Sequence, residues 1–481
     1  MLIEYFSTMK KAIIPFIVLF LLPHFLKASP EDSAYYNIKI KITGIKTAKV
    51  VLGYYLGEQT FAVDTAQVDT STGDIRFKTT RKLAQGVYFV AHTEGVVFNL
   101  ILATETDFSI STNISAPYDS AKIEHSVENA VYFNYMKAVQ KVQNDISQID
   151  GVTDMLRQAK ADKSVINAQQ QKITARYAGL DKYTQSVIRQ APHLFTSKLL
   201  NISTMPIVPT ELTQLKNDKP NPAYWFYFRK HFFDGVDFTD KRLVRSPYYV
   251  NRLGQFLGYM DNNTDSVKAE LDFLLNKTQP NAEFYKFTLK WLTAVFDDNM
   301  DRMPNADAYL IHLVEKYHRK AESGTDKYTL ERMEYKVNAF KNVLIGSPAP
   351  NFSLPNTEGV LKSLGDVKAD YVLVIFYSSL CAHCREAMPT IQNALQKMDS
   401  KKLKVFTVCT DGVRESWLPF LEEMKMKDWI NVIDKQPDTE IQKKYVTWSL
   451  PVLYLLDKNK TILANRIKPE NLNGLLLNDE K

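Results

Sequence analysis

The chain contains little cysteine: Cys381, Cys384 and Cys409 are the only three among 481 residues. A small scaffold held together by disulfides needs several pairs, so a chain of this size with three cysteines does not belong to that class. Low-complexity tracts are absent as well, and 45% hydrophobic with 24% charged residues is the composition of a globular protein. Because 481 residues exceed one ordinary core, we expect two to four domains.

A strong excess of one charge is also missing. The formal net charge is +6, and Lys and Arg are interspersed with Asp and Glu along the chain. A surface that binds nucleic acid through its phosphates needs clustered basic residues. We therefore expect no nucleic-acid partner.

Long apolar runs are confined to the N-terminus. Basic residues at positions 10–11 precede a short apolar stretch from Ala12 to Leu26, which is too short to span a bilayer comfortably. This pattern predicts an export signal over residues 1–28, and an uncleaved membrane anchor or a cytosolic protein are the alternatives. No cysteine lies in or just after this leader, so we expect no lipid anchor.

The residue pattern changes twice after the leader. Short β-runs with turns between them predict a small antiparallel β sandwich or barrel over residues 32–118. Helical periodicity then predicts an all-α domain over residues 125–343, with two long helices near 127–146 and 154–177. Its frequent aromatic residues either pack the helical core or line a ligand-binding groove. Strand–helix alternation over residues 344–481 predicts a mixed α/β domain.

The main functional signal is the pair Cys381 and Cys384, which follows the apolar run Tyr371–Phe376 and precedes a helical pattern. A CxxC motif where a strand turns into a helix is typical of a redox centre. The helix N-terminus stabilises a thiolate on the first cysteine, and the spacing lets the second cysteine close a disulfide with it.

Other interpretations of the pair are weaker. Purely structural disulfides rarely lie at a strand–helix turn. A metal site would have only two ligands from one CxxC, since no histidine follows His383. The residues before Cys381 lack the proline and threonine that position a peroxide in peroxiredoxins. Cys409 follows an apolar run and is expected to be a buried strand thiol. We expect no metal, and no cofactor beyond the cysteine pair.

Several elements in the right order carry a resemblance to a known family. They are a Gly-x-Pro-Ala-Pro-x-Phe run at residues 346–352, the CxxC motif, Pro389, and Leu450-Pro451 before a last apolar strand. In these residues the chain resembles the TlpA/ResA-like thioredoxin-fold thiol-disulfide oxidoreductases over about residues 344–477. The upstream β and helical regions resemble those that precede thioredoxin modules in some Gram-negative envelope proteins, which implies no activity for them.

The resemblance implies a role for each matching residue. Cys381 would be the exposed nucleophile, and Cys384 the more buried resolving thiol. Pro451 would be a cis-proline packed beside the pair. The backbone of Leu450 would then bind an extended substrate segment as an added strand.

Two residues are expected to tune the pair. His383 lies between the cysteines, where it can stabilise the thiolate, so we expect a more oxidising potential than that of a Gly-Pro thioredoxin. Family members commonly carry a carboxylate three residues after the second cysteine, but this chain has Ala387 there. The acid is Glu386, about 100° away around the helix. Glu386 either manages the proton of the pair or is a solvated helix charge, and water or His383 are other routes.

The sequence thus predicts an exported thiol-disulfide oxidoreductase in the periplasm or cell envelope. Its partners would be protein disulfide or dithiol substrates and an upstream redox donor or acceptor, with membrane contact only through an uncleaved anchor. The alternative is a ligand-binding or scaffold protein whose thioredoxin module is structural.

Overall fold

A computed structural model gives the structure of the protein, and it describes residues 33–78, 82–213, 221–260, 263–300, 303–396 and 402–473. The predicted export signal, residues 1–28, lies outside the described residues. The chain forms two compact units that divide between Met260 and Asp261, and each unit is described by itself. Across these described ranges, no helix combines the length and apolar character that a membrane span requires.

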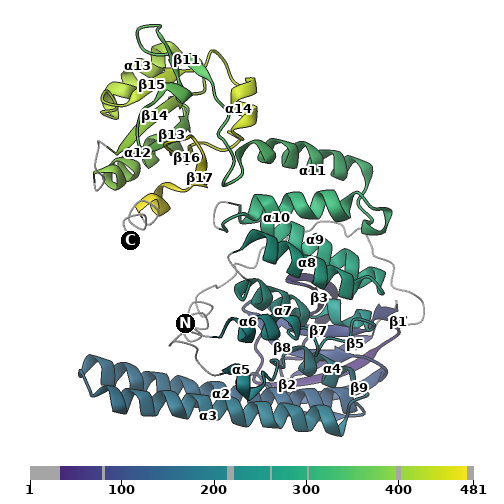
Figure 1. Ribbon diagram of the computed structural model, residues 1–481. Helices are drawn as coiled ribbons and strands as arrows, with labels where there is room; N and C mark the ends of the chain where they lie inside the picture. Colours follow the sequence, from purple (N-terminus) through teal and green to yellow (C-terminus); the bar gives the residue numbers. More distant parts are fainter. Residues whose placement is uncertain are drawn as a thin grey trace. The chain divides into compact units, whose positions relative to one another are not determined.

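The first unit begins with a β sandwich of two four-stranded sheets (Figure 1). Its strands are β2 Asn37–Thr43, β3 Lys49–Leu56, β4 Gln59–Gln67, β5 Asp74–Lys78, β7 Gly86–His92, β8 Gly95–Leu102, β9 Asp107–Asn113 and β10 Lys122–Glu124. One sheet has the order β10-β9-β2-β5 and the other the order β4-β3-β7-β8. A separate short pair joins β1 Ser33–Ala34 to β6 Leu83–Ala84.

Strand β2 shows why these residues form a sandwich. Ile38, Ile40 and Ile42 are buried, whereas Lys39 and Lys41 between them are exposed. This alternation places one face of the strand in the core and the other in water. Strand β2 pairs antiparallel with β5 and parallel with β9, so the sandwich is antiparallel except at the β2–β9 pair.

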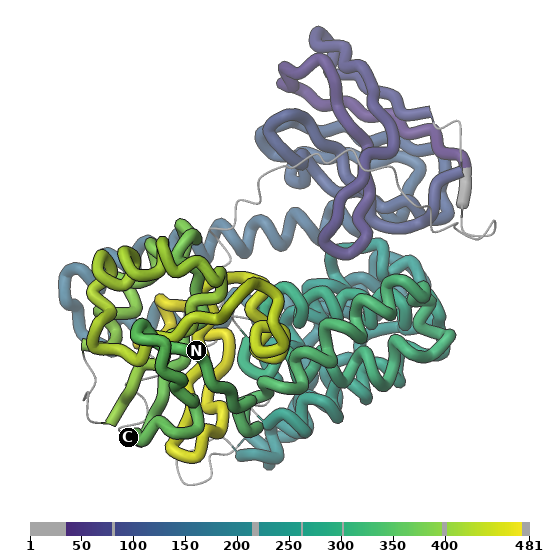
Figure 2. The backbone as a smooth tube through the Cα atoms, turned by 90° about the horizontal axis from the view of Figure 1, so that it is seen from above, coloured from purple at the N-terminus to yellow at the C-terminus, as the bar shows by residue number. Residues whose placement is uncertain are grey.

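Helices follow the sandwich in the same unit. They are α2 Val127–Gln158, α3 Lys163–Gln190, α4 Phe195–Ile202, α5 Thr210–Thr213, α6 Pro222–Lys230, the 3₁₀ helix η3 Lys241–Arg245, and α7 Pro247–Gly258. The α2–α3 hairpin extends well beyond the strands (Figures 1 and 2). Asn129 fixes its base to the sheet, because the buried amide accepts from the Ile101 N–H at 2.8 Å and donates to the Ile101 carbonyl at 2.9 Å.

The second unit starts with a stack of helices. They are α8 Thr264–Thr278, α9 Ala282–Asp298, α10 Ala306–Leu313, the π-helix η4 Val314–His318, the 3₁₀ helix η5 Ala321–Ser323, α11 Lys327–Phe340 and the 3₁₀ helix η6 Lys341–Val343. Each of α8 to α11 has one buried apolar face, as the helical periodicity predicted.

A mixed α/β fold completes the second unit. Its central strands are β13 Tyr371–Tyr377, β14 Leu403–Cys409, β15 Ile430–Ile433, β16 Val452–Asp457 and β17 Ile462–Ile467, in the order β15-β14-β13-β16-β17. Its other elements are the hairpin of β11 Ser353–Pro355 and β12 Leu361–Ser363, helices α12 Ala382–Leu395, α13 Arg414–Glu423 and α14 Glu440–Lys444, and the 3₁₀ turns η7 Leu364–Asp366 and η8 Pro469–Asn471.

Strand direction in this sheet decides where a site can form. Strands β13 and β14 are parallel and β16 is antiparallel to β13, so the carboxyl ends of the first two meet the start of β16 at one edge. The predicted fold class, a β sandwich followed by an all-α region and an α/β thioredoxin fold, is confirmed. The domain limits 32–118, 125–343 and 344–481 stay predictions, and the division between the two compact units falls inside the second of them.

A buried ion pair joins the helices of the second unit to its central sheet. Asp307 of α10, with 1% of its side chain exposed, accepts from the Arg466 Nη2 of β17 at 3.1 Å and from the Asn465 Nδ2 at 2.7 Å. The Arg466 guanidinium also lies over the ring of Phe340 of α11, 4.8 Å from its centroid. Helices α10 and α11 therefore pack on the edge strand as part of the same unit.

The buried His318 of η4 should make the second unit lose stability in acid. Its Nε2 and Nδ1 lie 2.7 Å from the hydroxyls of Thr293 and Thr325, and burial lowers its pKa from 6.5 to about 4. Between pH 6.5 and about pH 4 the unfolded chain therefore binds a proton that the folded chain does not bind. Between pH 7 and pH 5 this should lower the free energy of unfolding by about 2 kcal/mol.

Denaturant unfolding of full-length protein at the two pH values measures this loss. In His318→Gln the loss should shrink by about 2 kcal/mol. The exposed His193 of the first unit supplies the matched histidine-to-glutamine control variant. An unchanged difference in His318→Gln would contradict the assignment of the acid sensitivity to His318.

Candidate active site

The two cysteines of the motif lie where β13 passes into α12. Residues 378–380 form the connecting loop, and Cys381 is the N-cap of α12, its Sγ accepting from the Cys384 N–H at 3.3 Å. Cys384 lies in the first turn of the helix and is fully buried, whereas Cys381 is half-buried. Both are free thiols. The structure thus pairs an accessible sulfur with a buried one, the arrangement that the resemblance implied.

Leu450 and Pro451 lie at the same edge of the sheet. They directly precede β16, whose first residue, Val452, stands opposite Phe376 near the end of β13. The Leu450–Pro451 peptide bond is cis, the geometry that the resemblance implied. Leu450 and Cys381 pack against the same hydrophobic core. The structure therefore places Leu450 and Pro451 at the edge of the sheet where the cysteine pair lies.

The two predicted tuning residues are on the first turns of α12. His383 and Glu386 are both exposed to solvent, and Ala387, at the position of the family carboxylate, is half-buried. The neighbouring Arg385 forms an ion pair with Glu423 of α13. The tuning roles of His383 and Glu386 stay predictions.

Sequence reasoning missed Asp411, which follows β14. One carboxylate oxygen, Oδ2, accepts from the Ser378 hydroxyl at 2.9 Å and from the Ser379 N–H and hydroxyl at 2.6 and 2.8 Å. The other, Oδ1, accepts from the Val413 N–H at 3.0 Å and from the Cys409 thiol at 3.3 Å. Asp411 thus connects the loop before Cys381 with the end of β14. Its position after a strand parallel to β13 was the available signal.

The thiols and the carboxylate perturb one another. Burial raises the pKa of Cys384, and its hydrogen bond with Cys381 raises it further. Burial and the charge of Asp411 raise the pKa of Cys409 to about 12. Burial alone would raise the pKa of Asp411, but the hydrogen bonds it accepts outweigh this effect and hold that pKa below its usual range. At neutral pH the site therefore combines two protonated buried thiols with one carboxylate anion.

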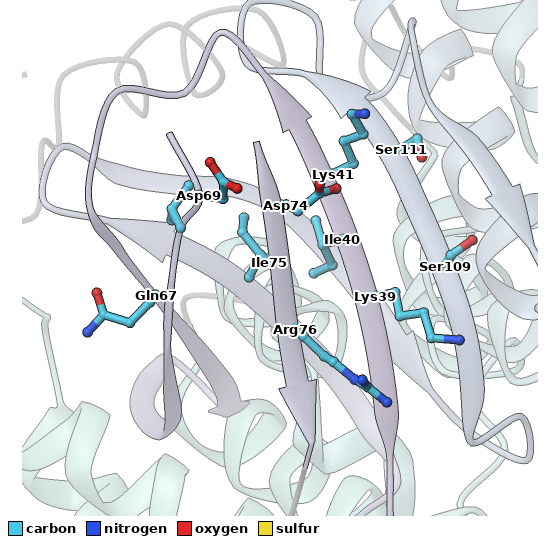
Figure 3. A pocket seen from close by; sticks show the side chains of 11 residues that line it. Lys39, Ile40, Lys41, Gln67, Asp69, Asp74, Ile75, Arg76, Ser109 and Ser111 are labelled. Carbon is cyan, nitrogen blue, oxygen red and sulfur yellow. The ribbon is translucent and has the colours of Figure 1, made fainter. Parts of the chain in front are cut away.

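The structure also has a hollow in the first unit, on the outer face of β2 and β5 (Figure 3). It measures about 790 Å³ and contains no cysteine or histidine among its lining residues. Lys39 there pairs with Asp107 at 3.7 Å, and Lys41 stands opposite Asp74 in the β2–β5 register. Lys39 and Lys41 thus each lie beside an acidic residue on a solvent-exposed face of the sheet. Within the described ranges, no three His, Cys, Asp or Glu side chains lie together as a metal site needs.

Known proteins resemble the second unit in particular. The AhpC/TSA family model matches residues 345–465. The thioredoxin-like protein YneN of Bacillus subtilis (strain 168) is 32% identical over 122 residues, which are 24% of this chain and 68% of YneN. The chain belongs to the thioredoxin-like family of thiol-disulfide oxidoreductases. The helices upstream match a domain of unknown function, DUF5106, over residues 184–342.

Other thioredoxin-like relatives cover a similar share of the chain. A thiol-disulfide oxidoreductase ResA of Bacillus cereus is 28% identical over 135 residues, 27% of this chain and 76% of ResA. A solved domain of a possible thiol-disulfide isomerase from Cytophaga hutchinsonii ATCC 33406 is 36% identical, covering 28% of this chain and 93% of that domain, with a TM-score of 0.27.

Proposed function

We propose that this thioredoxin-like protein exchanges a dithiol or disulfide at Cys381 and Cys384 with protein substrates in the cell envelope. The observation that carries the proposal is the position of the pair: an accessible sulfur caps α12, and a buried thiol lies one turn further along. An anion on Cys381 Sγ is stabilised by the Cys384 N–H and by the helix dipole.

The exchange takes two steps in the reducing direction. The Cys381 thiolate attacks one sulfur of a substrate disulfide, forms a mixed disulfide and releases the other substrate sulfur as a thiolate. Cys384 then loses its proton and attacks Cys381 Sγ, which releases the second substrate thiolate and closes the Cys381–Cys384 disulfide. Two electrons pass to the substrate. An upstream redox partner restores the dithiol, and the reverse sequence oxidises a substrate.

Residues around the pair support this chemistry. Leu450, half-buried directly before Pro451, offers its backbone to an extended substrate segment as an added strand beside the sulfurs. His383, exposed in the first turn of α12, lies where it can stabilise the attacking sulfur, and Glu386 can exchange the proton with water. The predicted leader of residues 1–28 supports an envelope location.

Trapping with Cys384→Ser tests the proposal. Without the resolving thiol, the mixed disulfide between Cys381 and its substrate should accumulate as adducts that dithiothreitol releases. The double variant Cys381→Ser/Cys384→Ser, which lacks both sulfurs, is the matched control and should form none. If Cys384→Ser forms no such adducts in the envelope, the chain would instead be a ligand-binding or scaffold protein.

A further inference from the structure

Cys409 is a third thiol beside the redox pair. It ends β14 opposite Tyr377 of β13, and it belongs to the same buried core as Cys384. The Ser378–Ser379 loop and the Cys409 thiol both donate hydrogen bonds to Asp411, so the loop and this sulfur lie on the same carboxylate. The site therefore holds three sulfurs, of which the exchange reaction uses two.

The third thiol could divert the reaction. If Cys409 lost its proton in the oxidised protein, its thiolate could attack Cys384 Sγ. That step breaks the Cys381–Cys384 bond, forms a Cys384–Cys409 disulfide and releases the Cys381 thiolate, so no external oxidant is needed. The product would hold the resolving sulfur in a buried bond, and a substrate captured on Cys381 could no longer be released.

Asp411 opposes this step through two separate contacts. Its Oδ1 accepts the Cys409 S–H at 3.3 Å, and its negative charge lies beside that sulfur, where a second anion would be repelled. Its Oδ2 holds the loop before Cys381 through three donors from Ser378 and Ser379. Five donors in all satisfy the carboxylate, so it acts as a fixed anion rather than a proton carrier.

We propose that Asp411 is the positioning residue of this active site: it anchors the Ser378–Leu380 loop and keeps Cys409 a protonated thiol, which confines the disulfide to Cys381 and Cys384. The inference rests on the proposed function only for its catalytic consequence. The state of Cys409 is measurable without any substrate.

Two substitutions separate the role of Asp411 as an anchor of the loop from the role of its negative charge. In Asp411→Asn, the amide oxygen can still accept from the loop, but the charge is lost and the amide nitrogen cannot accept from Cys409. Asp411→Ala removes both the negative charge and the oxygen that accepts hydrogen bonds from the loop. Asp434→Asn is the matched control, because Asp434 is a buried carboxylate after the neighbouring β15 whose side chain bonds Thr439 and Gln442 instead of the thiol loop.

The effect of the Asp411 charge is measured as the reactivity of Cys409 in the full-length protein. With Cys381 and Cys384 both changed to serine, iodoacetamide should alkylate Cys409 roughly tenfold faster in Asp411→Asn and Asp411→Ala than with Asp411 present, because loss of the neighbouring anion favours the Cys409 thiolate. In the three-cysteine background, diamide-oxidised Asp411→Asn should contain a Cys384–Cys409 disulfide on peptide mapping. The protein with Asp411 intact should contain only the Cys381–Cys384 disulfide, and so should the Asp434→Asn variant.

The effect of Asp411 as the anchor of the loop is measured as kcat/KM for the reduction of insulin disulfides. It should fall roughly tenfold to a hundredfold in Asp411→Ala and less in Asp411→Asn, because a displaced loop misplaces Cys381. Unchanged alkylation of Cys409 together with an unchanged disulfide map in Asp411→Asn would overturn the inference. If the protein with Asp411 intact reduces no protein disulfide, the proposed function fails, while the alkylation rates and the map still decide the role of Asp411.

Discussion

Replacing Cys381 with serine should lower the rate of insulin disulfide reduction by about a thousandfold or more. A serine hydroxyl is not ionised near neutral pH and cannot form a disulfide. The two remaining thiols do not take over, because Cys384 is fully buried and Cys409 is buried with a pKa raised to about 12 by burial and by Asp411. In the proposed reaction, exchange with a protein substrate must therefore begin at Cys381.

Two other cysteine variants make this result specific. Cys409→Ser removes a buried sulfur that the proposed exchange does not use, and it should reduce insulin at nearly the wild-type rate. Cys384→Ser should lose turnover but keep the first step, measured as one equivalent of thiol released per chain from a small aromatic disulfide. A Cys381→Ser protein as active as wild type would indicate that the fold serves as a scaffold.

The second large effect concerns stability: Asp307→Ala should lower the free energy of unfolding of the second unit by about 3–5 kcal/mol. The Asp307 and Arg466 side chains are 1% and 12% exposed, so the substitution leaves a guanidinium in the protein interior without its anion. Within the described residues, Nε and Nη1 of Arg466 have no hydrogen-bond partner, so little else compensates the charge.

Urea unfolding of the full-length protein measures the loss. The exposed ion pair between Lys327 and Glu331 of α11 is the matched control, and Glu331→Ala should change stability little. Asp307→Ala combined with Arg466→Met should recover part of the loss, because the second substitution removes the uncompensated charge. If Asp307→Ala lowers the free energy of unfolding as little as Glu331→Ala does, the buried ion pair contributes no more to stability than the exposed one.

Longer strands of the sandwich with alternating burial were predictable, whereas β4 and the three-residue β10 were not predicted. The run Ile38–Ile42 alternates strictly between core and solvent, which is the pattern of the short β-runs predicted over residues 32–118. Strand β4, Gln59–Gln67, lies at a sheet edge and buries only Ala66, so its sequence has no apolar period to detect. Edge strands are stabilised by hydrogen bonds to one neighbour, which a hydrophobic pattern does not record.

Helix ends were less predictable than helix positions. The long helix from Val127 was expected to end near Ile146, but α2 continues to Gln158 through Gly151. No atoms of other elements crowd that glycine, and one glycine lowers helix stability by only about 1 kcal/mol. Packing against α3 therefore maintains a helix that local propensity would end.

The cysteine pair was predictable because its signal is local, whereas Asp411 was not. Cys381 and Cys384 lie within one motif, and the resemblance added Pro451 by its place before the last apolar strand. Asp411 reaches the site from the end of a different strand. It accepts hydrogen bonds from Ser378 and Ser379, which precede it in the chain by 33 and 32 positions. Only the pairing of β14 with β13 brings these groups together.

The contacts of Arg466 also determine where the chain can be cut. The sequence suggests excising the redox module at residue 344, but such a fragment would leave behind Asp307 and the Phe340 ring beneath the guanidinium. It would also uncover Trp448, which stacks on Tyr335 of α11 with ring centroids 5.9 Å apart. A recombinant fragment that starts before α8 preserves all of these contacts, so the helices at the end of the DUF5106 match should be expressed together with the thioredoxin-like fold.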